Sequence, residues 1–259
     1  MTGPTPLLDF FKRGEVARDV RLVAAQGALA PRPYEQLAIL VHLHEDPDPE
    51  IRATATETLD RIPVPALQAF LARPDVPVDL REFFGDRGVF PDEIPPIDLD
   101  AETPLIDTEP PDVPDDVEEG EDSVIQKLTK MSFTERIKAA VKGTKEMRSI
   151  LIRDPNKLIA SSVLSSPKLT ESEIENFSRM ASISEDVLRT IAHNRQWTKI
   201  YGVVVGLTKN PKTPISISLN LMNRLHTRDM NQLSVDRNIP EPLRIAARKR
   251  VVASTSGKG

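Results

Sequence analysis

The sequence contains no cysteine. This absence excludes disulfide bonds, thiolate metal ligands and cysteine nucleophiles, and it fits a protein of the reducing cytoplasm. Long apolar runs are absent too, because the longest, YGVVVGL at 201–207, is far shorter than the roughly 20 residues that span a bilayer. In the N-terminal stretch MTGPTPLLDFFKRG the basic residues follow the apolar patch, the reverse of a signal peptide. We therefore expect a soluble cytoplasmic protein with no membrane partner.

Aromatic residues are scarce, at 4% of the chain against 39% for all hydrophobic residues. The apolar side chains are thus mainly Leu, Ile, Val and Ala, which suit helix packing better than aromatic-rich sheets. One stretch, PISISL at 214–219, alternates like a half-buried strand, but the NLMNRL that follows has helical spacing. We favour a helix there and predict an all-α fold.

Basic residues are missing from 91–122, which holds 14 acidic residues and seven prolines. Mutual repulsion and the missing amide donors predict an extended, disordered linker. The flanks differ in charge, because residues 1–90 carry a net charge of −4 and residues 123–259 a net charge of +13. The predicted domains are an N-terminal helical module at 1–90, the acidic linker at 91–122, a basic helical module at 123–253 and a disordered tail at 254–259.

Motifs of catalysis and metal binding are absent as well. The sequence has no GxSxG, no GxxxxGK[ST], no GxGxxG and no HExxH. His42 and His44 in HLHED are two residues apart, so on a helix they point away from each other, unlike the i, i+4 ligands of a helical zinc site. We predict no catalytic residue, no metal and no cofactor, and expect a protein that is not an enzyme. An enzyme of a type that no motif identifies stays open as a third interpretation.

What the sequence does have is a series of helix-start signals. SFTE at 132–135 and TESE at 170–173 fit capping boxes, in which a hydroxyl caps the third amide and a glutamate reaches back. Elsewhere an acid or serine precedes a helical pattern, twice with a proline at the first helical position. The predicted caps are Asp46 or Asp48, Ser132, Asp154, Thr170 and Ser184.

One of these signals is repeated far along the chain. DPDPEIRATA at 46–55 and RNIPEPLRIAARKR at 237–250 share an order of residue types: an Asp or Asn, two prolines, an acid, a branched apolar residue and an arginine. In the C-terminal half, Pro167 and Pro211 are 44 residues apart, as are Asn194 and Asn238. A period of about 40–47 with two helices per unit is typical of HEAT-type solenoids, in which stacked neighbours bury the apolar faces.

Two segments resemble known families of helical repeats. LHEDPDPEIRATATETL at 43–59 resembles the second helix of a HEAT repeat, and VLRTIAHNRQW followed by LTKNPKTP is similar to bacterial leucine-rich-repeat variants. The resemblance covers about 45–85 and 150–250, and the units are irregular, with about 29 residues between the phrases at 46 and 75. It implies two HEAT-like α-solenoid modules of stacked helix pairs, joined by the acidic linker.

The resemblance also implies residue roles. In such families, Asp and Arg form ladders between neighbouring repeats, so Arg52, Arg81, Arg189 and Arg244 are expected to bind within the chain. Some HEAT-like proteins are DNA glycosylases that use aromatic residues and an Asp in a basic groove. The aromatic residues available for such a role are Trp197 and Tyr201, four apart on a predicted helix face, where a core pair is an equally good interpretation.

The basic surplus of the C-terminal half is the candidate partner-binding feature. If its residues share one surface, that surface suits an acidic peptide or a nucleic-acid backbone; if they are scattered, they only solvate helices. We expect a protein partner, with nucleic acid as the alternative, and the acidic linker as a tethered competitor for the basic module. The candidate residues are Trp197, Lys199, Lys209, Lys212, Arg224, Arg228, Arg237, Arg248 and Lys249.

Overall fold

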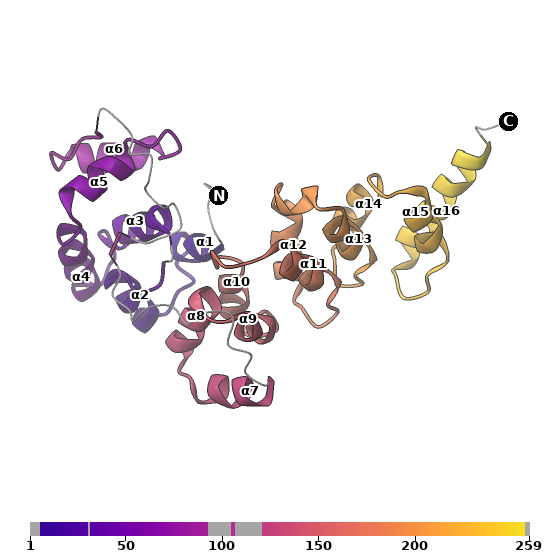
Figure 1. The fold of residues 1–259 in the computed structure, drawn as a ribbon, viewed down its shortest axis with the longest axis horizontal. Coiled ribbons are helices and arrows are strands. Elements are labelled where there is room, and N and C mark those ends of the chain that lie inside the picture. The colour runs from indigo at the N-terminus through magenta and orange to yellow at the C-terminus, as the bar shows by residue number, and fades with distance from the viewer. Residues whose placement is uncertain (1–5, 31, 93–104, 107–120, 257–259) are drawn as a thin grey trace. The chain divides into compact units, whose positions relative to one another are not determined.

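All regular structure in the described chain is helical. The computed structural model describes residues 6–30, 32–92, 105–106 and 121–256, and these contain sixteen α-helices, one 3₁₀ helix and no strand (Figure 1). The all-α prediction is confirmed. The ambiguous stretch PISISL lies mostly in helix α14 (Ile215–Met222), so the helical spacing that follows it decided its conformation.

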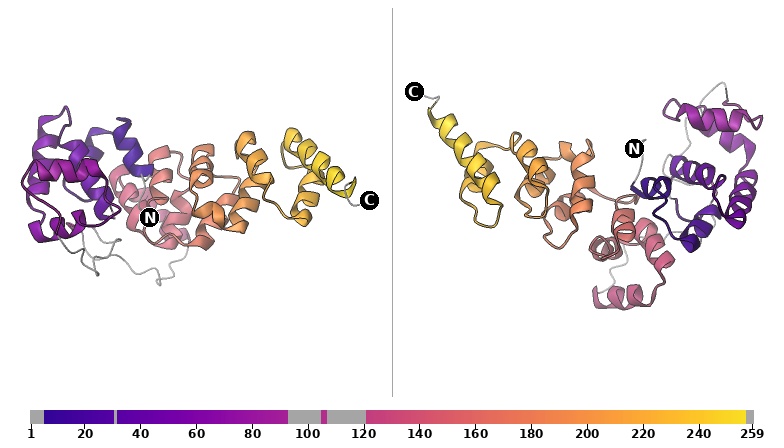
Figure 2. Two further views of the ribbon diagram at one scale, coloured as in Figure 1. Left: turned by 90° about the horizontal axis from the view of Figure 1, so that it is seen from above. Right: turned by 180° about the vertical axis from the view of Figure 1, so that it is seen from behind.

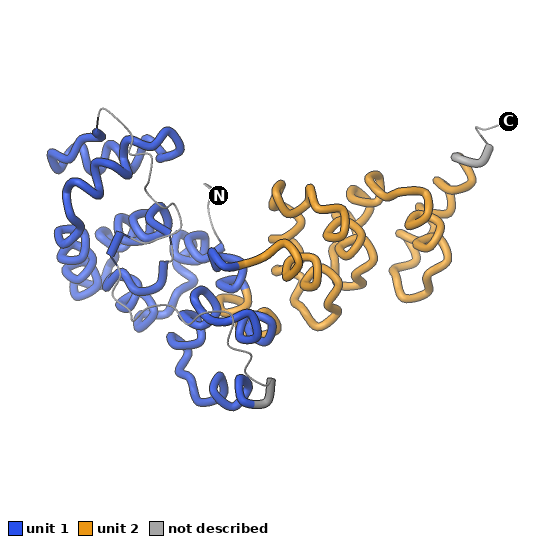
Figure 3. The backbone as a smooth tube through the Cα atoms, in the orientation of Figure 1, with its two compact units in different colours: residues 1–151, 161–168 blue, residues 152–160, 169–259 orange. Residues whose placement is uncertain are grey.

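The contacts divide the chain into two compact units (Figure 3). Unit 1 is Met1–Leu151 with Ser161–Lys168, and unit 2 is Ile152–Ala160 with Leu169–Gly259. Helix α6, before the acidic stretch 91–122, and helix α7, which begins at the last two residues of that stretch, both belong to unit 1. Most of that stretch lies outside the described residues, so the linker and the domain boundary within it stay predictions.

Unit 1 contains the first nine helices. Helix α10 (Lys157–Val163) begins in unit 2 and ends in unit 1. The helices of unit 1 are α1 (Pro6–Lys12), α2 (Arg18–Ala25), α3 (Pro33–Leu43), α4 (Pro49–Asp60), α5 (Val64–Leu71), α6 (Val78–Gly85), α7 (Glu121–Lys130), α8 (Phe133–Lys142) and α9 (Lys145–Leu151).

Helix α3 is the core helix of unit 1. It contacts α1, α2, α4 and α6. Its leucines recur at i, i+3 and i+6, and Leu37, Leu40 and Leu43 are all fully buried. Pro33 stands at its first turn, where an absent N–H costs no hydrogen bond. Because α3 is apolar on most sides, it packs only when several neighbours surround it.

Unit 2 contains the helices that follow α10. They are α11 (Glu171–Arg179), α12 (Glu185–His193), the 3₁₀ helix η1 (Trp197–Lys199), α13 (Tyr201–Lys209), α14, α15 (Thr227–Val235) and α16 (Glu241–Ser256). Its main packing pairs are α11 with α13, α13 with α14, α14 with α16, and α15 with α16. In both views of Figure 2 successive helices of this unit lie beside one another. Unit 2 is thus built from contacts between close neighbours in the sequence.

Two glycines allow the close approach of α11 and α13. An added Cβ on Gly206 would lie 2.0 Å from the Oγ of Ser178, and one on Gly202 would lie 2.3 Å from the carboxyl carbon of Glu175. At Gly206 the neighbouring atoms include the Cβ of Ser178, so a side chain there would push the helices apart, whereas beside Gly202 only the flexible carboxyl end of Glu175 would have to move. The GxxxG at 202–206 therefore serves helix packing within the unit.

The end of unit 2 has its own apolar cluster. Met222 from α14, Met230 and Leu233 from α15, and Leu243 and Ala247 from α16 are buried together. Helix α16 continues to Ser256, so the predicted disordered tail at 254–259 is wrong for 254–256, while 257–259 lie outside the described residues. No glycine or proline follows Pro242 until Gly257, so nothing in the sequence stops the helix earlier.

Most of the predicted caps are confirmed. The capping boxes at Ser132 and Thr170 are complete, and the side chains of Asp48 and Ser184 accept from first-turn amides. The cap predicted at Asp154 is wrong. Its Oδ1 accepts from the Asn156 amide, and Asn156 Oδ1 in turn accepts from the amide of Leu158, 2.9 Å away. Two cap-forming residues, two positions apart, compete here, and the second one starts the helix.

Glu35, in the first turn of α3, is fully buried, and burial raises the pKa of its carboxyl to about 8. The folded chain therefore keeps a proton that the unfolded chain loses above its ordinary pKa near 4.5. The contribution of this proton to the unfolding free energy is fully present below pH 4.5 and is lost as the pH rises toward 8.

We predict that unit 1 loses about 2–3 kcal/mol of unfolding free energy between pH 5 and pH 7, and that Glu35→Gln removes most of this slope. Urea unfolding followed by far-UV circular dichroism at both pH values measures it. Glu57→Gln, at an exposed position of α4, is the matched control and should keep the wild-type slope. Equal slopes in the two variants would contradict the assignment.

Candidate binding surfaces

The aromatic candidate of the basic half is part of the core. Trp197 is 7% exposed and lies in η1, whose Trp197 and Gln196 amides donate to Asn194 Oδ1 at 3.3 and 3.0 Å. Ile200 then takes an extended conformation and Tyr201 opens α13. The predicted shared helix face of Trp197 and Tyr201 is therefore wrong, because a break separates the two residues. A buried indole cannot stack on a ligand without local unfolding.

Three of the candidate cations are used by the fold. The Arg224 guanidinium donates to the carbonyl oxygen of Thr198 at 2.6 Å, and that of Arg248 donates to the carbonyl of Ser234 at 2.8 Å. The Lys209 ammonium lies 3.0 Å from Asp229 Oδ1. These side chains satisfy groups at helix ends or neutralise an acid, so their charge is largely committed within unit 2.

The remaining candidates are exposed. Lys199 donates to the side chain of Gln196, three residues earlier, at 3.0 Å. The other four have no hydrogen bond or ion pair from their side chains to a described residue. These four are Lys212, Arg228, Arg237 and Lys249. They are the cations of the predicted set that are available to a partner.

Helix α16 combines one of these cations with exposed apolar side chains. Ile245 is 44% exposed and Val252 is 60% exposed. With Lys249 they stand at i, i+4 and i+7 and so share one side of the helix. We call Ile245, Lys249 and Val252 the α16 face. The side of α16 that packs on α15 carries Leu243 and Ala247 instead.

A polar network links α13 to α15. The Tyr201 hydroxyl donates to Asp229 Oδ2 at 2.7 Å and accepts from the backbone amide of His226 at 3.0 Å. The ring of His226 lies over that of Tyr201 with centroids 4.2 Å apart. On the other side, Lys209 donates to Asp229 and, at 2.9 Å, to Gln232 Oε1.

The pKa shifts in this network indicate that it stabilises the packing of α13 against α15. The hydrogen bond from Tyr201 lowers the pKa of Asp229, with help from Lys209. Burial, together with the hydrogen bond to Asp229, raises the pKa of the Tyr201 hydroxyl, which therefore remains a donor rather than a base. Both carboxylate oxygens are already occupied. Asp229 is thus held ionised by Tyr201 and Lys209, and neither Asp229 nor Tyr201 is suited to act as a general acid or base.

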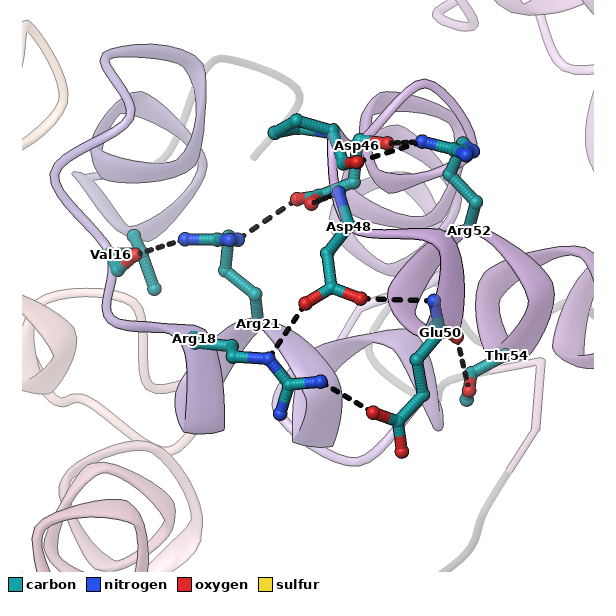
Figure 4. Close-up of polar contacts among 9 residues, drawn as sticks. Val16, Arg18, Arg21, Asp46, Asp48, Glu50, Arg52 and Thr54 are labelled. Atoms are coloured by element: carbon teal, nitrogen blue, oxygen red, sulfur yellow. Dashed lines mark hydrogen bonds and ion pairs between the residues drawn. The ribbon is translucent and has the colours of Figure 1, made fainter.

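The repeated phrase at 46–55 forms a second network, in unit 1 (Figure 4). Arg18 of α2 pairs with Glu50 and, at 2.6 Å, with Asp48, the cap of α4. Arg21 Nε lies 2.9 Å from Asp46, a carboxylate that is almost fully buried. The hydrogen bond from Arg18 lowers the pKa of Asp48. These pairs join the start of α2 to the turn before α4.

The four arginines expected to bind within the chain do so. Arg52 donates to the carbonyl of Asp46 at 2.6 Å, and Arg81 donates to the carbonyl of Leu71 at 3.0 Å. Arg189 and Arg244 instead pair with Glu185 and Glu241 of their own helices. The inference of intramolecular roles is confirmed, although carbonyl oxygens rather than aspartates receive the first two.

The histidines are also engaged within the fold. A ring nitrogen of His42 lies 3.0 Å from the carbonyl of Phe11, and Nδ1 of His193 lies 2.7 Å from that of Arg189. His44 lies between Thr56 and Arg87. In the described part of the chain no three His, Asp or Glu side chains converge on a point where they could hold a metal ion.

Comparisons with protein-family models, with curated proteins and with solved structures find no match to this chain. No helix among the described residues is long and apolar enough to cross a membrane.

We predict that Tyr201→Phe lowers the unfolding free energy of unit 2 by about 1–2 kcal/mol at pH 7, because Asp229 loses its strongest donor. Trp197, the only tryptophan of the chain, reports on this unit through its fluorescence during urea unfolding. Ser216→Ala is the matched control, since the hydroxyl of Ser216, at an exposed position of α14 in the same unit, has no hydrogen bond to a described residue. Its effect should stay below about 0.5 kcal/mol. Equal losses for the two variants would contradict the assignment.

Proposed function

We propose that the chain is a non-enzymatic binding protein built from HEAT-like helix pairs, and that it binds an acidic, partly apolar segment of a protein partner through α15 and α16. The α16 face carries this proposal. A lysine flanked one turn away on each side by an exposed branched side chain matches a partner that offers carboxylates beside apolar groups. Exposed Val235, Arg228 and Arg237 on and after α15 extend the same combination.

Sequential helix packing supports the repeat interpretation. The pairs α11–α13, α13–α14 and α15–α16 pack in chain order, as expected if each pair buries its apolar side on the next. Such arrays offer an extended outer surface, and surfaces of this kind suit protein segments.

Nucleic acid is the second candidate, because Lys212, Arg228, Arg237 and Lys249 are exposed cations whose side chains have no hydrogen bond or ion pair to a described residue. Salt separates the two functions. Phosphate binding releases condensed counterions and weakens steeply with salt, whereas an interface with an apolar component does not. The glycosylase-like activity that the resemblance implied would need an accessible aromatic residue. Trp197 is buried, and the half-buried Tyr201 is bonded to Asp229 through its hydroxyl.

We predict that the double substitution Ile245→Ser with Lys249→Glu removes partner proteins from an affinity pull-down of the full chain. The control is Val78→Ser with Lys12→Glu, which makes the same changes at an exposed valine and an exposed lysine of unit 1. Partners should survive nuclease treatment and 300 mM salt. Capture that disappears with nuclease supports the nucleic-acid function instead, and equal capture by both variants contradicts a role for the α16 face.

The acidic stretch is proposed to compete for this basic surface. Neutralising four of its acids, as Asp112→Asn, Asp115→Asn, Asp116→Asn and Glu118→Gln, should delay elution from heparin. The control neutralises four exposed acids of α4 and α6 or next to α6, as Glu57→Gln, Asp60→Asn, Glu82→Gln and Asp86→Asn, and changes the net charge equally. A larger delay for the first variant is expected from tethered competition. Equal retention of the two variants on heparin would contradict competition by the acidic stretch.

A further inference from the structure

Gln36 of α3 is a buried amide side chain whose partners come from two distant parts of unit 1. It is 1% exposed. Its Nε2 donates to the carbonyl of Gly27 at 3.0 Å and to the carbonyl of Ile106 at 2.8 Å. Its Oε1 accepts from the backbone amides of Leu105 at 2.9 Å and Ile106 at 3.2 Å.

These four bonds use the full hydrogen-bonding capacity of the Gln36 side chain. A carboxamide has two N–H donors and an oxygen with two lone pairs, and each has a partner here. One bond, to Gly27, fixes the amide in unit 1. The other three go to the main chain of Leu105 and Ile106, which sit between acidic residues in the stretch 91–122.

The conformation of the turn at Gly27 directs its carbonyl oxygen at the Gln36 side chain. Gly27 has a φ of +85°, a left-handed conformation that favours glycine, and its carbonyl faces Gln36. An added Cβ would lie 3.4 Å from both Gln36 Nε2 and a methyl group of Thr58. The loop after α2 thus holds the amide from one side while its other side binds the peptide main chain.

We propose that Gln36 is a peptide clamp, a binding site for an extended segment read through its backbone, and that the chain's own Leu105–Ile106 occupies it in cis. The ligand class is an extended peptide with two consecutive branched apolar residues. Proline is excluded at either position, because both amides donate to the clamp. Both side chains are half-buried, so apolar groups are favoured there.

The clamp lies in unit 1 and does not depend on the function proposed for α15 and α16 of unit 2. An attached segment has an effective concentration on the order of mM, so a free peptide at micromolar concentration does not displace it. The site therefore accepts a second segment only when its own is released.

The first experiment measures binding of a fluorescent peptide with the sequence of residues 101–110, AETPLIDTEP, by anisotropy. In the full chain Leu105→Pro with Ile106→Pro removes both amide donors and empties the clamp. This variant should bind the peptide at least tenfold more tightly than the wild-type chain does. The control Thr108→Pro with Glu109→Pro should behave as the wild type.

The specificity of the site is tested in the emptied variant. Peptide N-methylated at Leu105 and Ile106 should bind at least tenfold more weakly, because it cannot donate to Oε1. Adding Gln36→Leu should reduce binding equally, while Gln26→Leu, at an exposed position, should leave it unchanged. An emptied, folded variant that binds neither peptide, or binds both alike, overturns the clamp.

Hydrogen exchange on the wild-type chain gives a test that needs no emptied variant. The amides of Leu105 and Ile106 should exchange at least tenfold more slowly than those of an unstructured peptide, and Gln36→Leu should abolish this protection while Gln26→Leu preserves it. Free exchange in the wild type would overturn the proposal.

Discussion

Arginine side chains that donate to main-chain carbonyls hold the helices of this protein to one another. Arg81 reaches back to the end of α5, Arg224 to η1 and Arg248 to α15. The fully buried Arg148 donates to the carbonyl of Gly143, which ends α8. The last carbonyls of a helix have no partner within it, and the helices here are mostly too short to persist alone. In Arg81, Arg148 and Arg248 the guanidinium comes from the helix that follows those carbonyls. Arg224 donates from the residues just after α14, and each of these bonds helps to fix where its segment lies.

Because these arginines are bonded within the fold, the net positive charge overstates how many cations are free to bind a ligand. The basic half has a net charge of +13, yet much of it is committed to carbonyls or to acids such as Asp229. Four of the candidate cations have no hydrogen bond or ion pair from their side chains to a described residue, and three of these, Arg228, Arg237 and Lys249, lie on or beside α15 and α16. There the cations lie beside exposed valine and isoleucine, a mixture that differs from the uniformly basic surface that a phosphate backbone prefers.

Short-range signals in the sequence predicted the structure well. The capping boxes at Ser132 and Thr170 need only residues three apart, and the all-helical fold follows from composition and spacing. At Asp154 the same rules failed, because Asn156 offered an equally good cap two residues later. No sequence pattern indicated which residues far apart in the chain would form hydrogen bonds with one another. Tyr201 and Asp229 are 28 residues apart, and Gln36 and Ile106 are 70 apart, so neither pair could be found from local patterns.

The sequential packing of unit 2 has a kinetic consequence. Its main contacts join helices that are next or next but one in the chain, so each contact closes only a short loop and forfeits little chain entropy. Assembly of this unit is expected to be fast and to advance from one pair to the next. Its last pair, α15 with α16, rests on a small cluster around Leu233 and Leu243. Transient opening should therefore begin at that end, where the side chains proposed to bind a partner also lie.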